Sequence, residues 1–589
     1  MKRKDFLKNT FGASLGSLAL GRSAINPRPG YQNSNTLIES ISKTNDRRVA
    51  DYLSQQQRYT ETDSYRSRSG YLLAVSSGFC SEYSEYYRSD GLVTPMRQVV
   101  DSLLEDQNPD GTFDFGNLES PPDSAFMAEQ MFRAQALLLQ DGSSATAALR
   151  DSLRELLLNI AGALTAGGVH TPNHRWAISA ALAGINDLYP DQKYVNRIND
   201  WLGEGLGQDE DGEHPERSRN YDASVNNPSL LDVAIYQNRP ELFEAIRKNL
   251  ELTMYLMDSA GELETVSSRR QDQSPGRPVM IHRFYLPFRY MAIREDNPRF
   301  AAMARLIETK YMDQIGEHLG DFLLHEELNQ PLPEPVSPSD HFVKILKNTR
   351  LARIRRGEMT ASVFGGTDWH LGHGVWSGLS HNPTFFNFRK GDAVLESVRM
   401  SPAFFRTGYF RSQGLDVDGN TYRLWEERQV PYHQPLPESY RNPEGVYKMS
   451  PDGRFYSKMD FENRPKDYKK LRSEVIVREL NGSGSFEMEI LVDQTPDVDV
   501  TVELCFRKGG QLSGVIPKEG DPDGFLLSES TGSYRVGEDI IEFGPGRIEH
   551  TRSPQSNEQY AVHGGEIRLA GYRVYITGTT PFRHTLRIG

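Results

Sequence analysis

The sequence predicts a multidomain chain in which an N-terminal α/α toroid is followed by an antiparallel β-sandwich. Two patterns carry this prediction: apolar residues recur at helical spacing over 66–356, and apolar and polar residues alternate over much of 357–589. The length of 589 residues is the third observation, because one ordinary core rarely spans so long a chain. The composition, with 37% hydrophobic and 25% charged residues, is typical of a globular protein.

The N-terminus has the features of an export signal over residues 1–25. A basic head, Met1–Lys8, precedes a weakly apolar run of small residues. The segment Arg3–Lys8 resembles the twin-arginine export pattern with Lys4 in place of the second arginine, and no cysteine follows to accept a lipid. We therefore expect an exported protein, periplasmic or extracellular, and the alternative is a disordered cytoplasmic tail. The polar residues 26–65 are expected to form a linker or arm.

Residues 66–356 are expected to form the toroid and to be the catalytic domain. Their apolar residues fall on one helical face in successive stretches of ordinary helix length. The clearest stretches are Val99–Leu104, Phe126–Leu137, Leu153–Ile160, Leu230–Ile235, Leu242–Met257 and Phe300–Ile315. Neither strand-like alternation nor a strict repeat is visible, which favours an antiparallel helical array over a regular solenoid.

Residues 357–589 are expected to form the β-sandwich. Alternation of apolar and polar residues is cleanest in Val498–Leu504, and it recurs in 393–400, 473–478 and 485–492. Asn481-Gly482 and other turn signals separate these runs. This is the pattern of an antiparallel sheet with one buried face.

Composition also excludes several classes of function. The formal net charge of −13 argues against a general nucleic-acid binder, and no stretch is apolar enough to predict a membrane span. Cys80 and Cys505 lie too far apart in the sequence for a disulfide framework or a metal-binding motif, so we expect buried thiols. The sequence leaves the oligomeric state open.

Three polar loops within the helical region concentrate groups that move protons or bind anions. The first, Gly167–Trp176, brings Asn173 and His174 to the start of a helix. The second, Asp211–Tyr221, holds His214 and Tyr221 together with Arg217 and Arg219. The third, Ser267–Gln273, contains Arg269 and Arg270. Loops on a rigid scaffold commonly carry catalytic residues.

Taken together, Asn173-His174, His214 with Tyr221, and Arg269-Arg270 resemble the Asn, His, Tyr and Arg constellation of one class of polysaccharide lyases. These are the lyases built from an α/α toroid and a β-sandwich: the chondroitin AC and hyaluronate lyases, and the heparinase II/III and alginate lyase groups. The separation of His214 from Tyr221 is shorter than in the chondroitin lyase group. The resemblance implies β-elimination on an acidic polysaccharide or oligosaccharide that contains a uronic acid, with no cofactor required.

The chemistry of β-elimination gives each residue type a role. Asn173 would donate a hydrogen bond to the uronate carboxylate, and Arg270 or Arg269 would stabilise the charge that develops on it. Tyr221 could remove the C5 proton and protonate the departing oxygen if a neighbouring cation stabilises its phenolate. His174 and His214 are the alternative bases. The remaining arginines, Arg217 and Arg219, would bind the substrate with Arg269.

Each assignment has a structural alternative. Asn173 is also suited to capping the helix that follows it. His174 could be a core histidine, Tyr221 is one of 27 tyrosines, and Arg269-Arg270 could be a solvated pair at a helix end.

A loop rich in carboxylates, Asn108–Ser124, supports a competing function. Its four acidic residues are Asp110, Asp114, Glu119 and Asp123. Two of them could form the acid and base pair of a glycoside hydrolase on the same toroid, which is our alternative activity. Glu119 and Asp123 could instead bind a sugar, or the loop could be a plain turn with Asp123 as a helix cap. A non-catalytic glycan-binding protein is the third interpretation.

A second set of candidate ligands lies at the start of the β region. Asp368, His370 and His373, with His381 shortly after, could hold a structural zinc or calcium ion. Trp369 could instead bind a sugar together with the two histidines.

Overall fold

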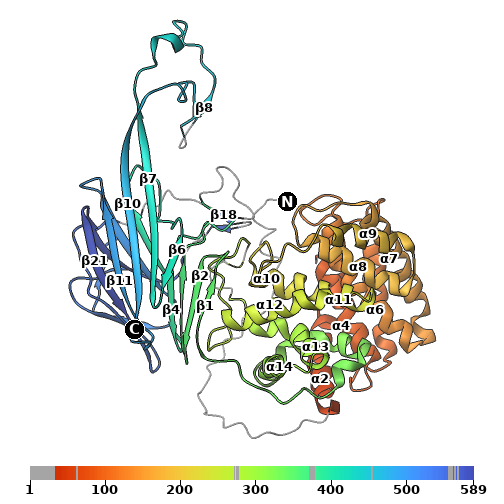
Figure 1. Ribbon diagram of the computed structural model, residues 1–589. Coiled ribbons are helices and arrows are strands. Elements are labelled where there is room, and N and C mark those ends of the chain that lie inside the picture. Colours follow the sequence, from red (N-terminus) through yellow and green to blue (C-terminus); the bar gives the residue numbers. More distant parts are fainter. Residues whose placement is uncertain are drawn as a thin grey trace. The chain divides into compact units, whose positions relative to one another are not determined.

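The computed structural model describes residues 34–589 except 62–63, 271, 273–277, 370–378, 453–455, 553, 555–560, 563–564 and 567–568. The chain divides into two compact units (Figure 1). The helical unit runs to Met257 and resumes over Gly261–Thr265 and Pro278–Ser339. The β unit takes Asp258–Ala260, Val266–Arg277 and Asp340–Gly589, so two short insertions from the helical half of the sequence belong to it.

The helical unit consists of α-helices and the loops that connect them. Its α-helices are α2 (Ser34–Ser54), α3 (Gln56–Glu61), α4 (Tyr65–Cys80), α5 (Val93–Asp106), α6 (Pro121–Asp141), α7 (Ala147–Ala166), α8 (His174–Leu188), α9 (Gln192–Gly203), α10 (Arg219–Tyr221), α11 (Asn227–Tyr236), α12 (Leu242–Leu256), α13 (Tyr285–Arg294), α14 (Pro298–Lys310) and α15 (Leu319–Leu324). Helices α4, α7 and α8 pack against α6, which is therefore central to the unit. No helix of the described part of the chain is long and apolar enough to cross a membrane.

Helix α6 shows how the local sequence sets an element that supports the site. The Ser120 hydroxyl accepts a hydrogen bond from the backbone N–H of Asp123, and prolines occupy the first helical positions. Gly142 ends the helix in the left-handed conformation, which glycine adopts without steric cost. Between these ends, Met131, Phe132 and Leu138 are buried in the core of the helical unit.

The N-terminal part of this unit differs from the expected linker over 26–65. Helix α2 occupies Ser34–Ser54, and α3 and the start of α4 follow it. The apolar residues of α2 are few, but Leu37, Ile41 and Val49 are buried in the helical core. Because polar residues outnumber them, the helical face is hard to see in the sequence. The proposed export signal over 1–25 lies outside the described residues.

The β unit contains two large sheets. The nine-stranded sheet has the order β1 (His341–Leu346), β2 (Leu351–Arg356), β3 (Met359–Phe364), β4 (Phe386–Lys390), β5 (Ala393–Pro402), β12 (Asp499–Phe506), β20 (Tyr572–Thr579), β15 (Gly524–Leu526), β14 (Ile516–Pro517). The eight-stranded sheet has the order β13 (Gln511–Ser513), β16 (Gly532–Val536), β17 (Asp539–Gly544), β21 (Phe582–Ile588), β11 (Ser485–Asp493), β10 (Lys466–Leu480), β7 (Thr421–His433), β6 (Leu415–Asp418). Two small hairpins, β8 (Ser450–Pro451) with β9 (Tyr456–Ser457) and β18 (Ala561–Val562) with β19 (Gly565–Glu566), complete the described strands.

The two large sheets share one apolar core and so form a sandwich. Val398 and Val502 of the first sheet and Val475 and Met488 of the second belong to the same buried cluster. All pairings in the described sheets are antiparallel except that of β15 with β20. The predicted fold class, helical then antiparallel β, is confirmed.

The change from helix to strand comes earlier in the sequence than the expected boundary at residue 356. Strands β1 and β2 already span His341–Leu346 and Leu351–Arg356. The second of these reads Leu-Ala-Arg-Ile-Arg-Arg, whose arginines and leucine are good helix formers. Its pairing with both β1 and β3 makes it a strand, so tertiary contacts override the local propensity.

Candidate active site

At the start of α8, a buried amide nitrogen has no hydrogen-bond partner in the part of the chain that the structure describes. Asn173 precedes the first residue of the helix, but its side chain does not cap it. Its Oδ1 accepts a hydrogen bond from the Thr171 hydroxyl at 2.8 Å, whereas its Nδ2 has no hydrogen-bond partner among the described residues. Asn173 is 0% exposed. Because a buried donor without an acceptor is costly, the position is suited to an acceptor supplied by a ligand.

His174 is the first residue of α8 and is buried beside aromatic rings. Its imidazole meets the ring of Phe126 edge-on at 5.9 Å and that of the exposed His170 at 4.6 Å between centroids. The contact with Phe126 agrees with the interpretation of His174 as a core histidine.

The second polar loop is anchored at its base by backbone and side-chain hydrogen bonds. Asp209 Oδ1 accepts the N–H groups of Asp211 at 3.0 Å and Glu213 at 2.9 Å, which closes a tight turn. The Gly212 carbonyl accepts a hydrogen bond from Asn249 Nδ2 of α12 at 3.0 Å. The loop is therefore fixed to α12 just before His214.

His214 is also buried, and its imidazole has no hydrogen-bond partner in the described ranges. It is 1% exposed, and neither ring nitrogen has a hydrogen-bond partner among the described residues. Burial lowers the pKa of His214 below its ordinary value, and the positive charge of Arg219 lowers it further, against the opposing effects of Asp222 and Asp209. The ring is therefore neutral at pH 7, so one of its nitrogens can donate a hydrogen bond and the other can accept one.

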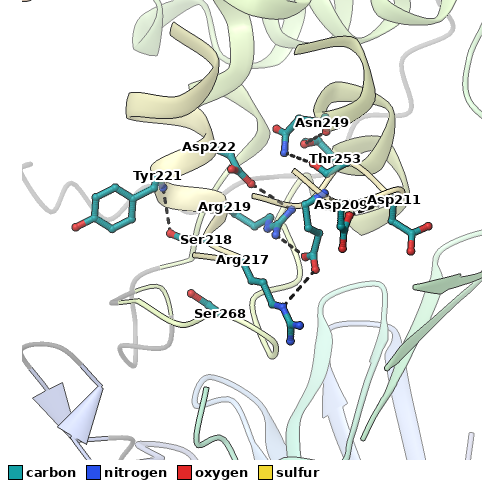
Figure 2. A network of polar contacts seen from close by, with 12 residues as sticks. Asp209, Asp211, Arg217, Ser218, Arg219, Tyr221, Asp222, Asn249, Thr253 and Ser268 are labelled. Carbon is teal, nitrogen blue, oxygen red and sulfur yellow. Dashed lines mark hydrogen bonds and ion pairs between the residues drawn. The ribbon is translucent and has the colours of Figure 1, made fainter. Parts of the chain in front are cut away.

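Arg219 forms ion pairs with Glu213 and Asp222, the residues on either side of the His214–Tyr221 segment (Figure 2). Its Nη2 lies 2.7 Å from Glu213 Oε1, and its Nη1 lies 3.2 Å from Asp222 Oδ2. Arg217 approaches the same Glu213 carboxylate at 3.9 Å. Arg219, Glu213 and Asp222 are all buried. Arg219 was expected to bind substrate. Its guanidinium instead pairs with two carboxylates of the protein itself and so stabilises the loop.

Tyr221 is half-buried and ends the one-turn helix α10. Its N–H donates to the hydroxyl of Ser218 at 3.1 Å, and a π-helical turn, Asp222–Asn226, follows directly. Turns of this type are rare and are frequent at functional sites. Figure 2 shows the phenol directed away from the ion pairs around Arg219.

The structure brings the first two polar loops together. The backbone N–H of Asn173 donates to Glu216 Oε1 at 3.0 Å, two residues beyond His214. The sequence motif contained Glu216, but nothing in its spacing indicated a link to Asn173. Glu213 was likewise missed, although its position among arginines is a signal for an ion pair.

The third polar loop belongs to the β unit. The guanidinium of Arg269 holds both oxygens of Asp368, with Nε to Oδ2 at 2.7 Å and Nη2 to Oδ1 at 2.8 Å. Asp368 Oδ2 also accepts the N–H of Ser380 at 2.8 Å. Arg270 is buried, and its N–H donates to the Ser268 hydroxyl at 3.1 Å.

Trp369 and His381 form a compact aromatic pair in the β unit, with ring centroids 5.4 Å apart. The Arg411 guanidinium lies 4.1 Å from the Trp369 ring, and its Nε donates to the His381 carbonyl at 2.9 Å. Burial and the charge of Arg411 lower the pKa of His381 to about 4.

The proposed metal site is only partly within the described residues, because His370 and His373 fall outside them. Asp368, the third candidate ligand, is paired with Arg269. In the described part of the chain, no group of three candidate ligands is placed to hold a metal ion.

Acidic residues of the Asn108–Ser124 loop accept hydrogen bonds from the backbone of the same loop and so stabilise it. Asp110 accepts the N–H of Thr112 at 2.9 Å, and Asp114 accepts that of Glu119 at 2.7 Å. The Glu119 N–H, with Asn108, lowers the pKa of Asp114. Asp123 pairs with Arg66, and the N-cap of α6 is Ser120, so the interpretation of Asp123 as that cap is wrong. Glu119 itself is exposed.

Comparison with known proteins identifies the fold. No family model matches the sequence, and no curated protein matches it. Among solved structures, the chain is similar to heparinase III, with 13% identity and a TM-score of 0.52 over 89% of this chain and 76% of that one. It is also similar to the Streptomyces coelicolor A3 chondroitin AC lyase in complex with chondroitin sulphate, with 11% identity and a TM-score of 0.55 over 100% of this chain and 82% of that one. The protein therefore has the fold of the polysaccharide lyases that combine a helical array with an antiparallel β-sandwich.

Proposed function

We propose that the protein is a polysaccharide lyase that cleaves a uronic-acid-containing glycan by β-elimination. The reaction would leave an unsaturated uronate at the new non-reducing end. The observation that carries this proposal is the buried Nδ2 of Asn173, a hydrogen-bond donor without a partner among the described residues. The fold shared with heparinase III and the chondroitin AC lyase is consistent with it.

The elimination begins with the uronate carboxylate. The C5 proton next to an ionised carboxylate is only weakly acidic, so the carboxylate must first be neutralised. Asn173 Nδ2 supplies one hydrogen bond to it, and the neutral imidazole of His214 can supply another. Such preorganised donors stabilise the charge that develops on the carboxylate as the C5 proton leaves.

Proton transfer is assigned to Tyr221, with His174 and His214 as the alternative bases. The base takes the C5 proton, the C4–O bond breaks, and a C4–C5 double bond forms. The departing oxygen takes a proton from the same phenol or from a histidine. In this proposal Arg217 contributes to substrate binding.

A glycoside hydrolase is supported less well by the acidic loop. Its reaction needs one protonated and one ionised carboxyl group facing the scissile bond. Asp110 and Asp114 accept hydrogen bonds from their own loop, and Asp123 is paired with Arg66. The lowered pKa of Asp114 keeps it ionised and unsuited to be the acid.

A panel of uronate polysaccharides, followed by two readouts, tests the proposal. A lyase creates a double bond conjugated to the carboxylate, which absorbs in the far ultraviolet, and it also releases new reducing ends. A hydrolase releases reducing ends without that absorbance, and a binding protein gives neither signal. Reducing ends without the absorbance would contradict the proposal.

Variants then test the residues. Tyr221→Phe removes only the phenolic hydroxyl, and we expect kcat to fall by about 10²- to 10⁴-fold, the usual contribution of a general acid or base. Asp123→Asn should retain most of the activity. Tyr87→Phe, at an exposed tyrosine of the same unit, is the matched control and should be silent. Full activity in Tyr221→Phe combined with an inactive Asp123→Asn would favour the hydrolase.

A further inference from the structure

An arm of the β unit carries much of the exposed apolar surface of the protein. Strands β7 and β10 pair with their neighbours β6 and β11 only up to Leu424 and from Arg472 onward. Beyond that point, 429–433 and 466–470 pair only with each other, and residues 434–465 connect them. Figure 1 shows this ribbon continuing past the sheet toward β8. We call residues 429–470 the arm.

The arm exposes an unusual number of large apolar side chains to solvent. Of the fifteen large apolar side chains that are exposed among the described residues, seven lie in the arm: Tyr432, Tyr440, Val446, Met449, Tyr456, Met459 and Tyr468. Tyr456, Val446 and Met449 are 71%, 68% and 61% exposed. In addition, 466–470 is exposed at every position, on both faces of the strand. Large exposed apolar side chains gathered in one segment are typical of an interaction site, and an isolated two-stranded ribbon is marginally stable in water.

The chemistry of these side chains indicates a protein partner rather than a glycan. Tyrosine can stack on sugar rings, but valine and methionine have no flat face for a pyranose. Tyrosine and methionine are both enriched at protein interfaces. Lys466, Lys469 and Lys470 blunt the outer edge of the ribbon against strand pairing, so the partner would contact its faces and tip.

The distribution of formal charge along the sequence favours a second copy of this chain as the partner. The arm contains eight Lys or Arg and six Asp or Glu, whereas the whole chain has a formal net charge of −13. The rest of the chain therefore carries all of the net negative charge. The basic arm of one copy is therefore opposite in charge to the acidic remainder of a second copy.

We propose that the protein forms a homodimer through the arm, with Val446, Met449 and Tyr456 buried against the second copy. Light scattering after size exclusion tests this on the full chain at micromolar concentration, and a mass twice that of one chain is expected. The variant Val446→Ser/Met449→Ser/Tyr456→Ser should raise the dissociation constant of the dimer by at least about tenfold, because a few central apolar residues dominate most interfaces. The melting temperature of this variant should equal that of the parent when both are measured at a protein concentration below the dissociation constant of the dimer.

Leu118→Ser/Ile516→Ser is the matched control, since Leu118 and Ile516 are 83% and 48% exposed and lie outside the arm. This variant should remain a dimer. A parent protein with the mass of one chain, or a dimer that survives the triple substitution, would overturn the proposal. Loss of retention on an immobilised acidic polysaccharide, with no change in mass, would also overturn it and would assign the arm to glycan binding.

Discussion

Glu129 of α6 is a carboxyl group buried in the interior of the helical unit. The Ser229 hydroxyl donates to its Oε1 at 3.2 Å. Its neighbour Arg133 is already committed, with Nη2 at 2.7 Å from both oxygens of Asp232 and Nε at 3.0 Å from Asp321 Oδ1. One guanidinium thus serves two aspartates. Burial, and then the charge of Asp232, raise the pKa of Glu129 to about 8. The carboxyl group is therefore protonated at neutral pH.

This raised pKa predicts how stability depends on pH. In the unfolded chain Glu129 ionises near pH 4.5, whereas in the folded chain it keeps its proton up to about pH 8. Its contribution to stability is thus complete below pH 4.5 and is lost as the pH rises toward 8. Glu129→Gln keeps the size and removes the titration, so we expect it to be more stable than the parent at pH 8 by on the order of a few kcal/mol.

Urea unfolding at pH 4.5 and pH 8 measures this difference, and the two proteins should be closest in stability at pH 4.5. Glu155→Gln, at an exposed position of α7, is the control and should show no such pH dependence. A Glu129→Gln variant that is less stable than the parent at pH 8 would mean that the carboxylate is ionised and supports Arg133.

For single residues of the candidate site, the sequence predicted which side-chain types take part but not which contacts they make. Asn173, His214 and Tyr221 could be grouped in advance, because an amide, an imidazole and a phenol can each take a role in β-elimination. The sequence could not show whether Asn173 caps the helix or donates to a ligand, because an asparagine directly before a helix is suited to both roles. That distinction depends on where the Nδ2 points in three dimensions. The role of Arg219 was hidden for the same reason, since its two carboxylate partners are set by the turn of the chain.

At the scale of elements, the loop before His214 depends on one glycine. Gly212 has a φ of +93°, and a Cβ there would lie 2.5 Å from the carbonyl oxygen of Lys248 in α12. Gly212→Ala must therefore strain the turn or push the loop off α12. We expect a loss of at least about 1 kcal/mol in stability and a larger loss in kcat, because His214 follows two residues later.

Gly168→Ala is the matched control for this substitution. Gly168 lies in the loop before Asn173, but a Cβ there would meet nothing within 4 Å. Stability by thermal melting and kcat on the active substrate should both be retained in this variant. Equal behaviour of the two variants would show that the anchoring of the Gly212 turn has no part in the reaction.

Elements with a strong period could be predicted, and those set by distant partners could not. The helices α6, α7 and α12 follow from apolar residues at helical spacing, and β11 and β12 follow from alternation. Helix α2 was missed because its buried face is narrow, and β2 because its arginines favour a helix. The residues Asp222–Asn226 gave no indication of the π-helical turn that follows Tyr221.

At the scale of the whole molecule, the order of the two architectures could be predicted but not their interleaving. The helical half of the sequence sends Asp258–Ala260 and Val266–Arg277 into the β unit. There Asp258 forms a buried ion pair with Arg389 at 2.8 Å, and Arg269 pairs with Asp368. A boundary drawn on the sequence at residue 356 separates both pairs, because it assigns Asp258 and Arg269 to one domain and Arg389 and Asp368 to the other.

This interleaving predicts that a fragment starting at Asp340 is an incomplete β unit. Without Asp258, the buried Arg389 loses the carboxylate that lies 2.8 Å from its guanidinium, and breaking a buried ion pair by removing one member typically costs about 3 to 5 kcal/mol. In the intact chain, Arg389→Met should destabilise the β unit because it breaks this ion pair. In the fragment 340–589 the same substitution should cost less stability than in the intact chain, because the ion pair with Asp258 is already absent. Hydrogen exchange of the β12 and β20 amides measures both cases, and an Arg389→Met substitution that lowers protection equally in the fragment and in the intact chain would refute the argument.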